Sequence, residues 1–161
     1  MAKSVKAIPD GYHTITPSLT IRGAAKAIDF YKKALGAEEI MRMPGPGGTV
    51  MHAELKIGNS NFMLGEESQE SGCLSPQGIG GSATTLYIYV ENVDAAWKRA
   101  MDAGGKAKMP PTDMFWGDRM SNFEDPFGHK WSLAQHIKDV TPEEMKKGAQ
   151  AFMEQMKTKK K

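Results

Sequence analysis

A chain of 161 residues can bury one sizeable core, and its formal net charge of +2 excludes a strongly basic or acidic protein. Lysines near the C-terminal end carry much of this charge, and the aromatic residues do not alternate with a basic stripe, so we expect no nucleic-acid partner. No apolar run reaches membrane-spanning length and no signal peptide is visible. The single cysteine, Cys73, excludes an internal disulfide and indicates the reducing cytoplasm.

The first half of the chain predicts a strand, a helix and three further strands. Apolar and polar residues alternate over residues 14–22, as in a half-buried strand. The apolar residues that follow have helical spacing up to Gly36, which is typical of a helix C-cap. Gly58 and Asn59 predict the tight turn of a hairpin. The expected elements are a strand over 14–22, a helix over 24–35, and strands over 38–43, 50–57 and 61–64.

The second half of the chain repeats this order. Pro110 and Pro111 cannot donate hydrogen bonds to a neighbouring strand, so we expect the strand that ends at Pro110 to lie at the edge of its sheet. Asp125, Pro126 and Gly128 are typical of a turn, and we favour that interpretation over a catalytic role. The expected elements are a strand over 84–90, a helix over 93–101, and strands over 106–110, 116–123 and 129–135.

The two halves align with each other at an offset of 69 residues. The aligned pairs include Thr16 with Thr85, Leu19 with Ile88, Gly36 with Gly105, and Met63 with Ser132. A long period that occurs only twice predicts a duplicated module, because a solenoid needs at least three repeats. We expect a cleft between the modules, and we look for function there. The predicted α+β domain, residues 1–161, divides into a βαβββ module over 13–67, a linker loop over 68–82 and a second module over 83–137.

The segment between the modules, residues 66–81, is rich in Gly, Ser and Glu and predicts a mobile linker, with a lid as the alternative. Its glycine run lacks the spacing of a phosphate-binding loop. Cys73 lies in this segment and is expected to be exposed. A catalytic thiol needs an activating base or a helix terminus, and none can be assigned to Cys73.

A further helix is predicted over residues 140–157. Thr141 and Glu144 match a capping box, with Pro142 at the first helical position. We expect the apolar stripe of this helix to be buried on the chain's own domain, and a dimer contact is the alternative. The stripe consists of Met145, Ala149, Phe152 and Met156, of which the first three are expected to be buried.

Four segments of the chain resemble a known family: DFYKKALGAEE, MHAELKIGNSNFMLGEE, VENVDAAWKRAMDAGG and DMFWGDRMSNFEDPFGHKWSLAQHIKDVTPEEM. Over roughly residues 13–145 the chain resembles the glyoxalase/bleomycin-resistance/dioxygenase superfamily, also called vicinal oxygen chelate proteins, and within it the PhnB-like branch. The most specific match is residues 115–135. The resemblance implies two βαβββ modules whose mixed sheet curls around a cleft. It also implies that metal-dependent members place four ligands, drawn from His, Glu and Gln, on the first and last strands of the modules.

The resemblance places those four ligand positions at Thr16, Met63, Thr85 and Ser132. The offset of 69 residues relates them in pairs, which supports the assignment. Neutral hydroxyl groups and a thioether are poor ligands for divalent metals that prefer carboxylate or imidazole groups. We therefore expect neither a metal nor another cofactor.

Strand alternation extends the expected cleft beyond these four positions, because side chains two residues apart share a face. Across each hairpin we expect paired residue numbers with an odd sum. This register brings Glu54 beside Met63, and brings Arg119 to the face of Ser132. Trp116 is expected at the rim. The predicted ligand-binding cleft consists of Thr16, Ser18, His52, Glu54, Met63, Thr85, Tyr87, Tyr89, Trp116, Arg119, Ser121 and Ser132.

Two interpretations are open for the charged residues of this cleft. His52 and Glu54 can share a metal ion or a proton, or they can form a structural contact. Arg119 can hold the carboxylate or phosphate of a ligand, or it can pair with Glu54 or Asp118.

The tyrosines, Tyr87 and Tyr89, can stack on an aromatic ligand or line a hydrated groove. His136 ends its strand without an assigned partner, and no catalytic residue is assigned. We expect a metal-independent small-molecule binding protein of the glyoxalase/bleomycin-resistance type, for an aromatic or anionic ligand. We also expect a homodimer, formed through sheet edges or the C-terminal helix. The alternative is a metal-dependent lyase, isomerase or dioxygenase-like enzyme with a displaced metal site near His52 and Glu54.

Overall fold

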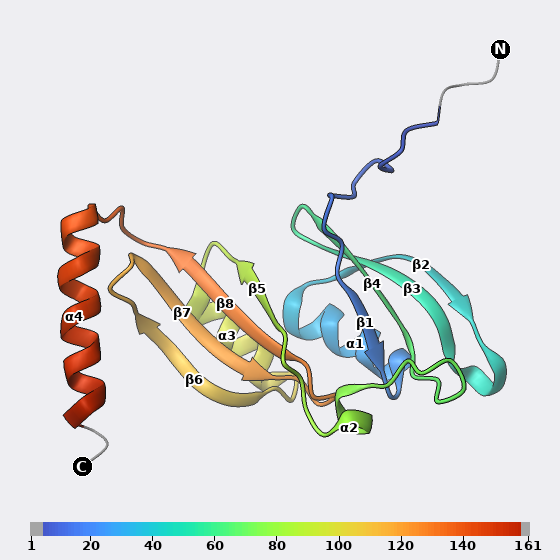
Figure 1. The fold of residues 1–161 in the computed structure, drawn as a ribbon. Helices are drawn as coiled ribbons and strands as arrows, with labels where there is room; N and C mark the ends of the chain where they lie inside the picture. The colour runs from blue at the N-terminus through green and yellow to red at the C-terminus, as the bar shows by residue number, and fades with distance from the viewer. Residues whose placement is uncertain (1–4, 159–161) are drawn as a thin grey trace.

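The fold consists of two four-stranded sheets that lie side by side, with one long helix behind each (Figure 1). The computed structural model describes residues 5–158. The first module contains β1 (Ser18–Ile21), α1 (Ala24–Leu35), β2 (Glu38–Pro44), β3 (Val50–Ile57) and β4 (Ser60–Glu66). The second contains β5 (Thr85–Tyr89), α3 (Val93–Asp102), β6 (Lys106–Asp113), β7 (Asp118–Glu124) and β8 (Lys130–His136). The short helix α2 (Pro76–Ile79) lies between the modules, and α4 (Pro142–Thr158) follows them.

Both sheets have the same topology, which confirms the α+β class and the duplicated βαβββ order. The strand orders are β1-β4-β3-β2 and β5-β8-β7-β6. The first pair in each order is parallel and the other pairs are antiparallel. Ser18 lies opposite Met63 in one sheet, and Tyr87 lies opposite Ser132 in the other. These pairs differ by the offset of 69 residues that the sequence shows.

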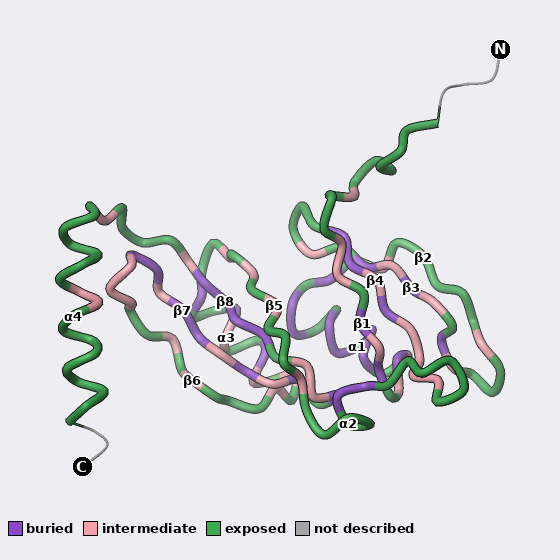
Figure 2. Tube along the Cα trace, viewed as in Figure 1, coloured by how far each residue is buried: buried purple, intermediate pink, exposed green. Residues whose placement is uncertain are grey.

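Alternate residues of each sheet face its helix and form the core. Leu55 and Leu64 of the first sheet are buried against Ile28 of α1, and Leu133 of the second is buried in the same core as Ala100 of α3. Figure 2 shows the buried stretches along α1, β7 and β8. The opposite face of each sheet carries no helix, and we call it the helix-free face (Figure 1).

A buried carboxylate, that of Asp125, joins the two modules. Its Oδ2 accepts hydrogen bonds from the Tyr31 hydroxyl of α1 at 2.7 Å and from Trp131 Nε1 of β8 at 2.9 Å. Its Oδ1 accepts from the backbone N–H groups of Phe127 and His129, both at 2.9 Å. Asp125 therefore has the turn role that the sequence predicts, and it also anchors the second module to α1.

The strand β6 lies at the edge of its sheet, as the prolines predict. It is longer than expected, because it continues through Pro110 and Pro111 to Asp113. Its pairing with β7 shifts between Ala107 and Met109, and again between Met109 and Thr112. These irregularities let an edge strand contain two residues that cannot donate to the ladder.

The odd-sum register is right for the first hairpin and wrong for the second. Glu54 pairs with Met63 as expected, but Asn122 pairs with Ser132. Four residues separate the paired Lys56 and Asn61, whereas five separate Glu124 and Lys130. The extra residue of the second turn shifts the register by one, and a one-residue shift moves every side chain of β7 to the opposite face.

The segment between the modules has more structure than a linker of its composition predicts. Ser75 is fully buried and caps α2. Its backbone N–H and its hydroxyl donate to Glu67 Oε2 at 3.1 and 2.6 Å. Arg22 also donates to Glu67, and these hydrogen bonds, that of Arg22 first, lower the pKa of Glu67 to about 2. Cys73 is exposed, as expected.

The helix α4 has the predicted capping box but not the predicted burial. Glu144 Oε2 accepts from the Thr141 N–H at 2.8 Å, and Thr141 Oγ1 accepts from the Glu144 N–H at 3.2 Å. No residue of α4 is buried, so the expected burial of Met145, Ala149 and Phe152 is wrong. The helix projects from the end of the second module (Figure 1), and its Phe152 packs against Phe115, with ring centroids 5.8 Å apart. Over residues 5–158 no helix is long and apolar enough to cross a bilayer.

We expect Tyr31→Phe to lower the free energy of unfolding by about 1.5–3 kcal/mol, as for the loss of a buried hydrogen bond to a charged group. The ring and its packing are retained, so the loss reports the hydroxyl alone. Urea unfolding followed by tryptophan fluorescence measures the effect. Asp102→Asn, which removes an exposed contact with Lys98, is the control and should change little. A Tyr31→Phe protein as stable as the parent would show that the Asp125 contact does not hold the modules together.

Candidate functional site

The helix-free face of the second module carries a cluster of four polar side chains. Tyr87 and Tyr89 project from β5, Asp118 from β7 and His136 from β8. Ser132 and His136 are four residues apart on β8, so they face the same side of the sheet. Tyr87 pairs with Ser132 and Asp118 pairs with His136, and Tyr89 lies two residues after Tyr87. The four side chains of the cluster therefore share one face. The corrected register brings Asp118 to this face.

Asp118 is only 4% exposed and is the centre of the cluster. Its Oδ2 accepts from the Tyr89 hydroxyl at 3.0 Å and from the Tyr87 hydroxyl at 3.2 Å. Its Oδ1 lies 2.9 Å from His136 Nδ1, and His136 Nε2 lies 3.0 Å from Asp139 Oδ1. The tyrosine rings, with centroids 5.4 Å apart, are thus fixed by their hydroxyl groups, while Tyr87 and Tyr89 as whole residues are 45% and 64% exposed. We call these two rings the tyrosine platform.

The pKa values of the cluster follow from these contacts. Burial, together with the nearby Asp118 charge, raises the pKa of Tyr87 to about 12. Burial alone would raise the pKa of Asp118, but hydrogen bonds from His136, Tyr89 and Tyr87 offset it, so that this pKa is lowered. The carboxylates of Asp139 and Asp118 raise the pKa of His136. The cluster therefore favours an ionised carboxylate beside a protonated imidazole.

The first module has a smaller polar group on its helix-free face. His52 Nε2 lies 3.2 Å from Glu54 Oε1, and the Tyr12 hydroxyl donates to Glu54 Oε2. The hydrogen bond from Tyr12 lowers the pKa of Glu54. A cavity of about 530 Å³ lies beside this group and is also lined by Thr16 and Met63. His52 and Glu54 thus form the contact that the sequence allows, with Tyr12 as a third member.

The four ligand positions taken from the family do not fit a divalent metal. Thr16 precedes β1, and its hydroxyl donates to the His13 carbonyl at 3.1 Å. The Ser132 hydroxyl donates to Asn122 Oδ1 at 2.7 Å. Met63 offers a thioether and Thr85 an exposed hydroxyl. Neither donor is preferred by divalent metals in oxygen or imidazole sites, and within residues 5–158 no three His, Cys, Asp or Glu side chains form a group able to hold a metal ion.

Arg119 and Ser121 lie on the helix side of the second sheet, not on the face of Ser132. Arg119 donates to Asp94 of α3 at 2.8 and 2.9 Å and to Asp113 at 2.7 Å. Neither of the carboxylates that the sequence offered as its partner, Glu54 and Asp118, takes that role. Ser121 is fully buried. The expectation that Arg119 shares the face of the tyrosines is therefore wrong, and the extra residue in the second turn is the cause.

The remaining predicted residues are spread over both modules. Ser18 lies opposite Met63 at the start of β1. Trp116 packs edge-on against Phe115, with ring centroids 5.0 Å apart, in the loop between β6 and β7. No sequence pattern pointed to Tyr12, which lies outside the predicted strands. Asp118 and His136 could have been found by testing the even-sum register of the second hairpin.

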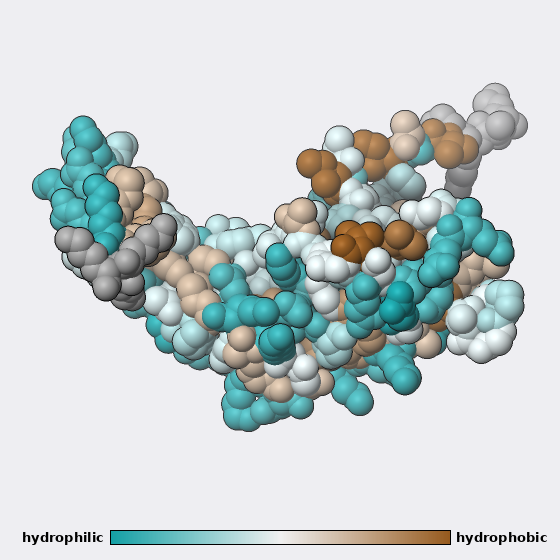
Figure 3. Space-filling view, turned by 60° about the horizontal axis from the view of Figure 1, so that its bottom comes forward, coloured by the Kyte–Doolittle hydropathy of each residue, from teal (hydrophilic) through white to brown (hydrophobic). Residues whose placement is uncertain are grey.

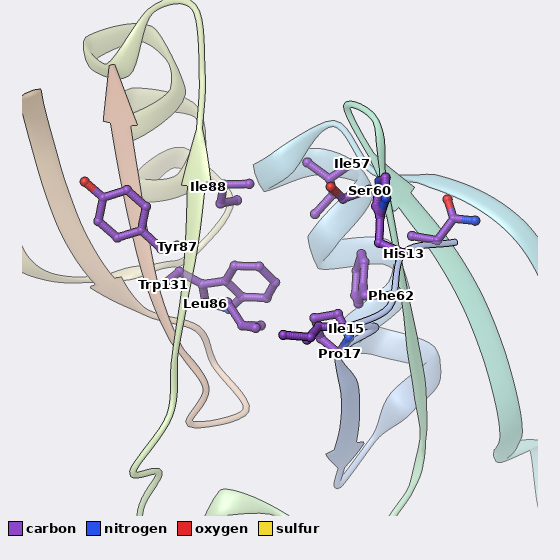
Figure 4. Close-up of a pocket in the computed structure, with 11 residues that line it drawn as sticks. His13, Ile15, Pro17, Ile57, Ser60, Phe62, Leu86, Tyr87, Ile88 and Trp131 are labelled. Carbon is purple, nitrogen blue, oxygen red and sulfur yellow. The ribbon is translucent and has the colours of Figure 1, made fainter. Parts of the chain in front are cut away.

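A cavity of about 230 Å³ lies between the two modules (Figure 4). Leu86, Ile88 and Trp131 of the second module point toward Phe62 and Ile57 of the first, while Tyr87 points away from them. The lining of this cavity is largely apolar, in contrast to the two polar clusters.

Residues 12–133 match the model of the Glyoxalase/Bleomycin resistance protein/Dioxygenase superfamily, so the chain belongs to this superfamily. The Mycobacterium tuberculosis protein Rv0887c is 39% identical over 134 residues, which cover 81% of this chain and 79% of the relative.

Solved structures show the same architecture. TioX from Micromonospora sp. ML1 superposes with a TM-score of 0.62 and 25% identity, covering 78% of this chain and 99% of TioX. The PhnB protein from Bacillus cereus superposes with a TM-score of 0.58 and 21% identity, covering 76% of this chain and 99% of PhnB. The likeness to PhnB is one of fold.

We expect the pKa of His136 to lie above that of a free histidine and to fall in Asp118→Asn, although Asp139 still holds it above the usual value. Because the folded-state pKa is raised, the stabilisation from this group is complete at low pH and is lost as pH rises through that pKa. NMR titration of the histidine Cε1–H resonances measures both effects. Asp102→Asn is the control. A His136 pKa that is unchanged in Asp118→Asn would contradict the coupling.

Proposed function

We propose that the chain is a metal-independent small-molecule binding protein whose ligand lies on the helix-free face of the second module. The tyrosine platform carries this proposal. Two exposed rings, fixed by hydrogen bonds from their hydroxyl groups to the buried Asp118, offer aromatic contact area that needs little further ordering on binding. The expected ligand is planar and aromatic.

Metal independence is part of the proposal, and the donor set supports it. Hydroxyl groups and a thioether stand at the four family positions, and two of the hydroxyl groups already donate to protein oxygen atoms. At the alternative site, Glu54 is shared between His52 and Tyr12. A metal there would have to displace Tyr12 and would find two protein ligands, fewer than the three of most catalytic zinc sites.

We expect the uncharged aromatic 2-naphthamide to raise the melting temperature of the protein equally with and without a chelator. Tyr89→Leu should weaken its binding about 3- to 10-fold, because a stacked aromatic pair contributes roughly 0.5–1.5 kcal/mol beyond its buried area. Thermal shift and isothermal titration calorimetry measure these effects. Tyr12→Leu, which changes a tyrosine of the other module, is the matched control.

Two results would contradict this proposal. One is equal binding of 2-naphthamide by Tyr89→Leu and the parent, and the other is binding that appears only when a divalent metal is added. Elemental analysis of the purified protein provides an independent measure of bound metal. One tightly held metal ion per chain would favour the enzyme alternative near His52 and Glu54.

We also propose that the chain is a homodimer in the cytoplasm, with α4 in the interface. Met145, Phe152, Met153 and Met156 are each more than one-third exposed, and an apolar stripe of this kind is normally covered. Figure 3 shows hydrophobic residues along one side of α4 and hydrophilic ones along the other. The lone, exposed Cys73 suits a reducing compartment.

We expect Phe152→Asp to convert the dimer to a monomer, because a charge in an apolar interface has no partner. Light scattering after size exclusion measures the mass. Gln150→Asp, at an exposed position of the same helix, is the control and should remain dimeric. If the parent is a monomer at micromolar concentration, or if both variants stay dimeric, α4 is not the interface.

A further inference from the structure

A groove that adjoins the cavity of Figure 4, and shares Ile57 and Ile88 with it, follows β5 between the modules. It has a volume of about 770 Å³, within the range of small-molecule sites. Leu35 at the end of α1 and Ile57 of β3 form one wall, and Val90 and Ala96 form the other. Its polar groups come from the β3–β4 turn, from β5, from the residues just before α3 and from the last turn of α3.

Arg99 of α3 lines this groove and differs from the other three arginines of the chain. Arg22, Arg42 and Arg119 each have a carboxylate partner within 4.0 Å. Among residues 5–158, none lies within that distance of Arg99. A guanidinium beside an apolar wall without an anion is a site where an anion would be favourable.

The orientation of Arg99 is fixed by one hydrogen bond. Its Nε donates to the carbonyl of Ala34 at 3.2 Å, in the last turn of α1. This contact satisfies a carbonyl at a helix C-terminus, which is a structural role. It uses one of the five N–H donors of the guanidinium, so the rest of the fork can bind an oxyanion. The bond to α1 therefore orders the side chain before a ligand arrives.

Glu91 is the acidic residue in the groove. It lies before α3, while Arg99 lies near the C-terminal end of that helix, and the two do not form an ion pair. The charge of Glu91 opposes an anion in the groove without neutralising Arg99. Replacing Glu91 by Gln should therefore strengthen the binding of an anion, and this change does not affect the hydrogen bond from Arg99 to the end of α1.

We propose that this groove binds a small organic carboxylate with a planar apolar body, whose carboxylate is held by Arg99. The apolar walls contact the body of the ligand, and the free N–H groups of Arg99 select the charge. Tyr87 and Tyr89, which form the platform, also line this groove, but Arg99 and Glu91 belong to the groove alone. The inference therefore does not rest on the proposed function.

The test compares 2-naphthoate with 2-naphthamide, which has the same rings and no charge. Calorimetry near neutral pH should show that the parent binds naphthoate more tightly than naphthamide. Arg99→Gln should weaken naphthoate binding about 10-fold or more, as for lost hydrogen bonds to a charged group, and should leave naphthamide unchanged. Glu91→Gln should tighten naphthoate binding about two- to fivefold, by removing a partly solvated like charge. Arg42→Gln, whose ion pair with Glu39 lies outside the groove, is the matched control.

Arg99→Gln also loses the bond to Ala34, so its melting temperature must be recorded, and Glu91→Gln provides a test that is independent of α1. The inference is overturned if naphthoate and naphthamide bind equally, or if neither Arg99→Gln nor Glu91→Gln changes naphthoate binding. In that case the proposed function stands as long as naphthamide responds to Tyr89→Leu. If instead naphthoate binding depends on Arg99 while naphthamide does not bind, the groove is supported and the platform is rejected.

Discussion

The buried carboxylate of Asp125 is the central polar contact between the two modules, beside the packing of aromatic rings across the junction and the hydrogen bond from Arg99 to Ala34. Asp125 accepts hydrogen bonds from Tyr31 of the first module and from Trp131 of the second, as well as from two backbone N–H groups of its own turn. A buried charge is costly unless hydrogen bonds satisfy it, so these four donors are needed together. Both the tyrosine platform and the Arg99 groove lie on or beside β5, whose place against the first module depends on this junction.

One extra residue in the turn that contains Asp125 makes the two modules differ in chemistry. The turn lengthens the second hairpin, and β7 therefore presents Asp118 where the odd-sum register would present Arg119. The duplicated backbone is retained while the polar residues of its helix-free face change. The first module has a glutamate shared by Tyr12 and His52, and the second has an aspartate shared by two tyrosines and a histidine.

Much of the fold could be predicted from the sequence because its signals are local. Alternation, helical spacing, the capping box at Thr141 and the turn at Asp125 each involve residues close along the chain. The candidate site could not be predicted equally well, because the pairing register of a hairpin depends on the conformation of its turn. In a long turn that conformation cannot be deduced from residues close along the chain. An apolar stripe such as that of α4 also shows that a face needs covering, but not which surface covers it.

The charges of the chain separate two properties that the sequence assigned to one site. Aromatic contact remains with Tyr87 and Tyr89, whose neighbouring charge is the negative Asp118, so an anion gains nothing from that carboxylate. Arg119, the cation expected beside them, is neutralised by two carboxylates on the helix side of the sheet. Arg99 has no such partner among the described residues, and it lines a groove that has both apolar and polar walls. Electrostatics therefore favours an uncharged aromatic group on the platform and an anion between the modules. The register of β7 decides which faces Asp118 and Arg119 occupy, and α3 places Arg99 in the groove.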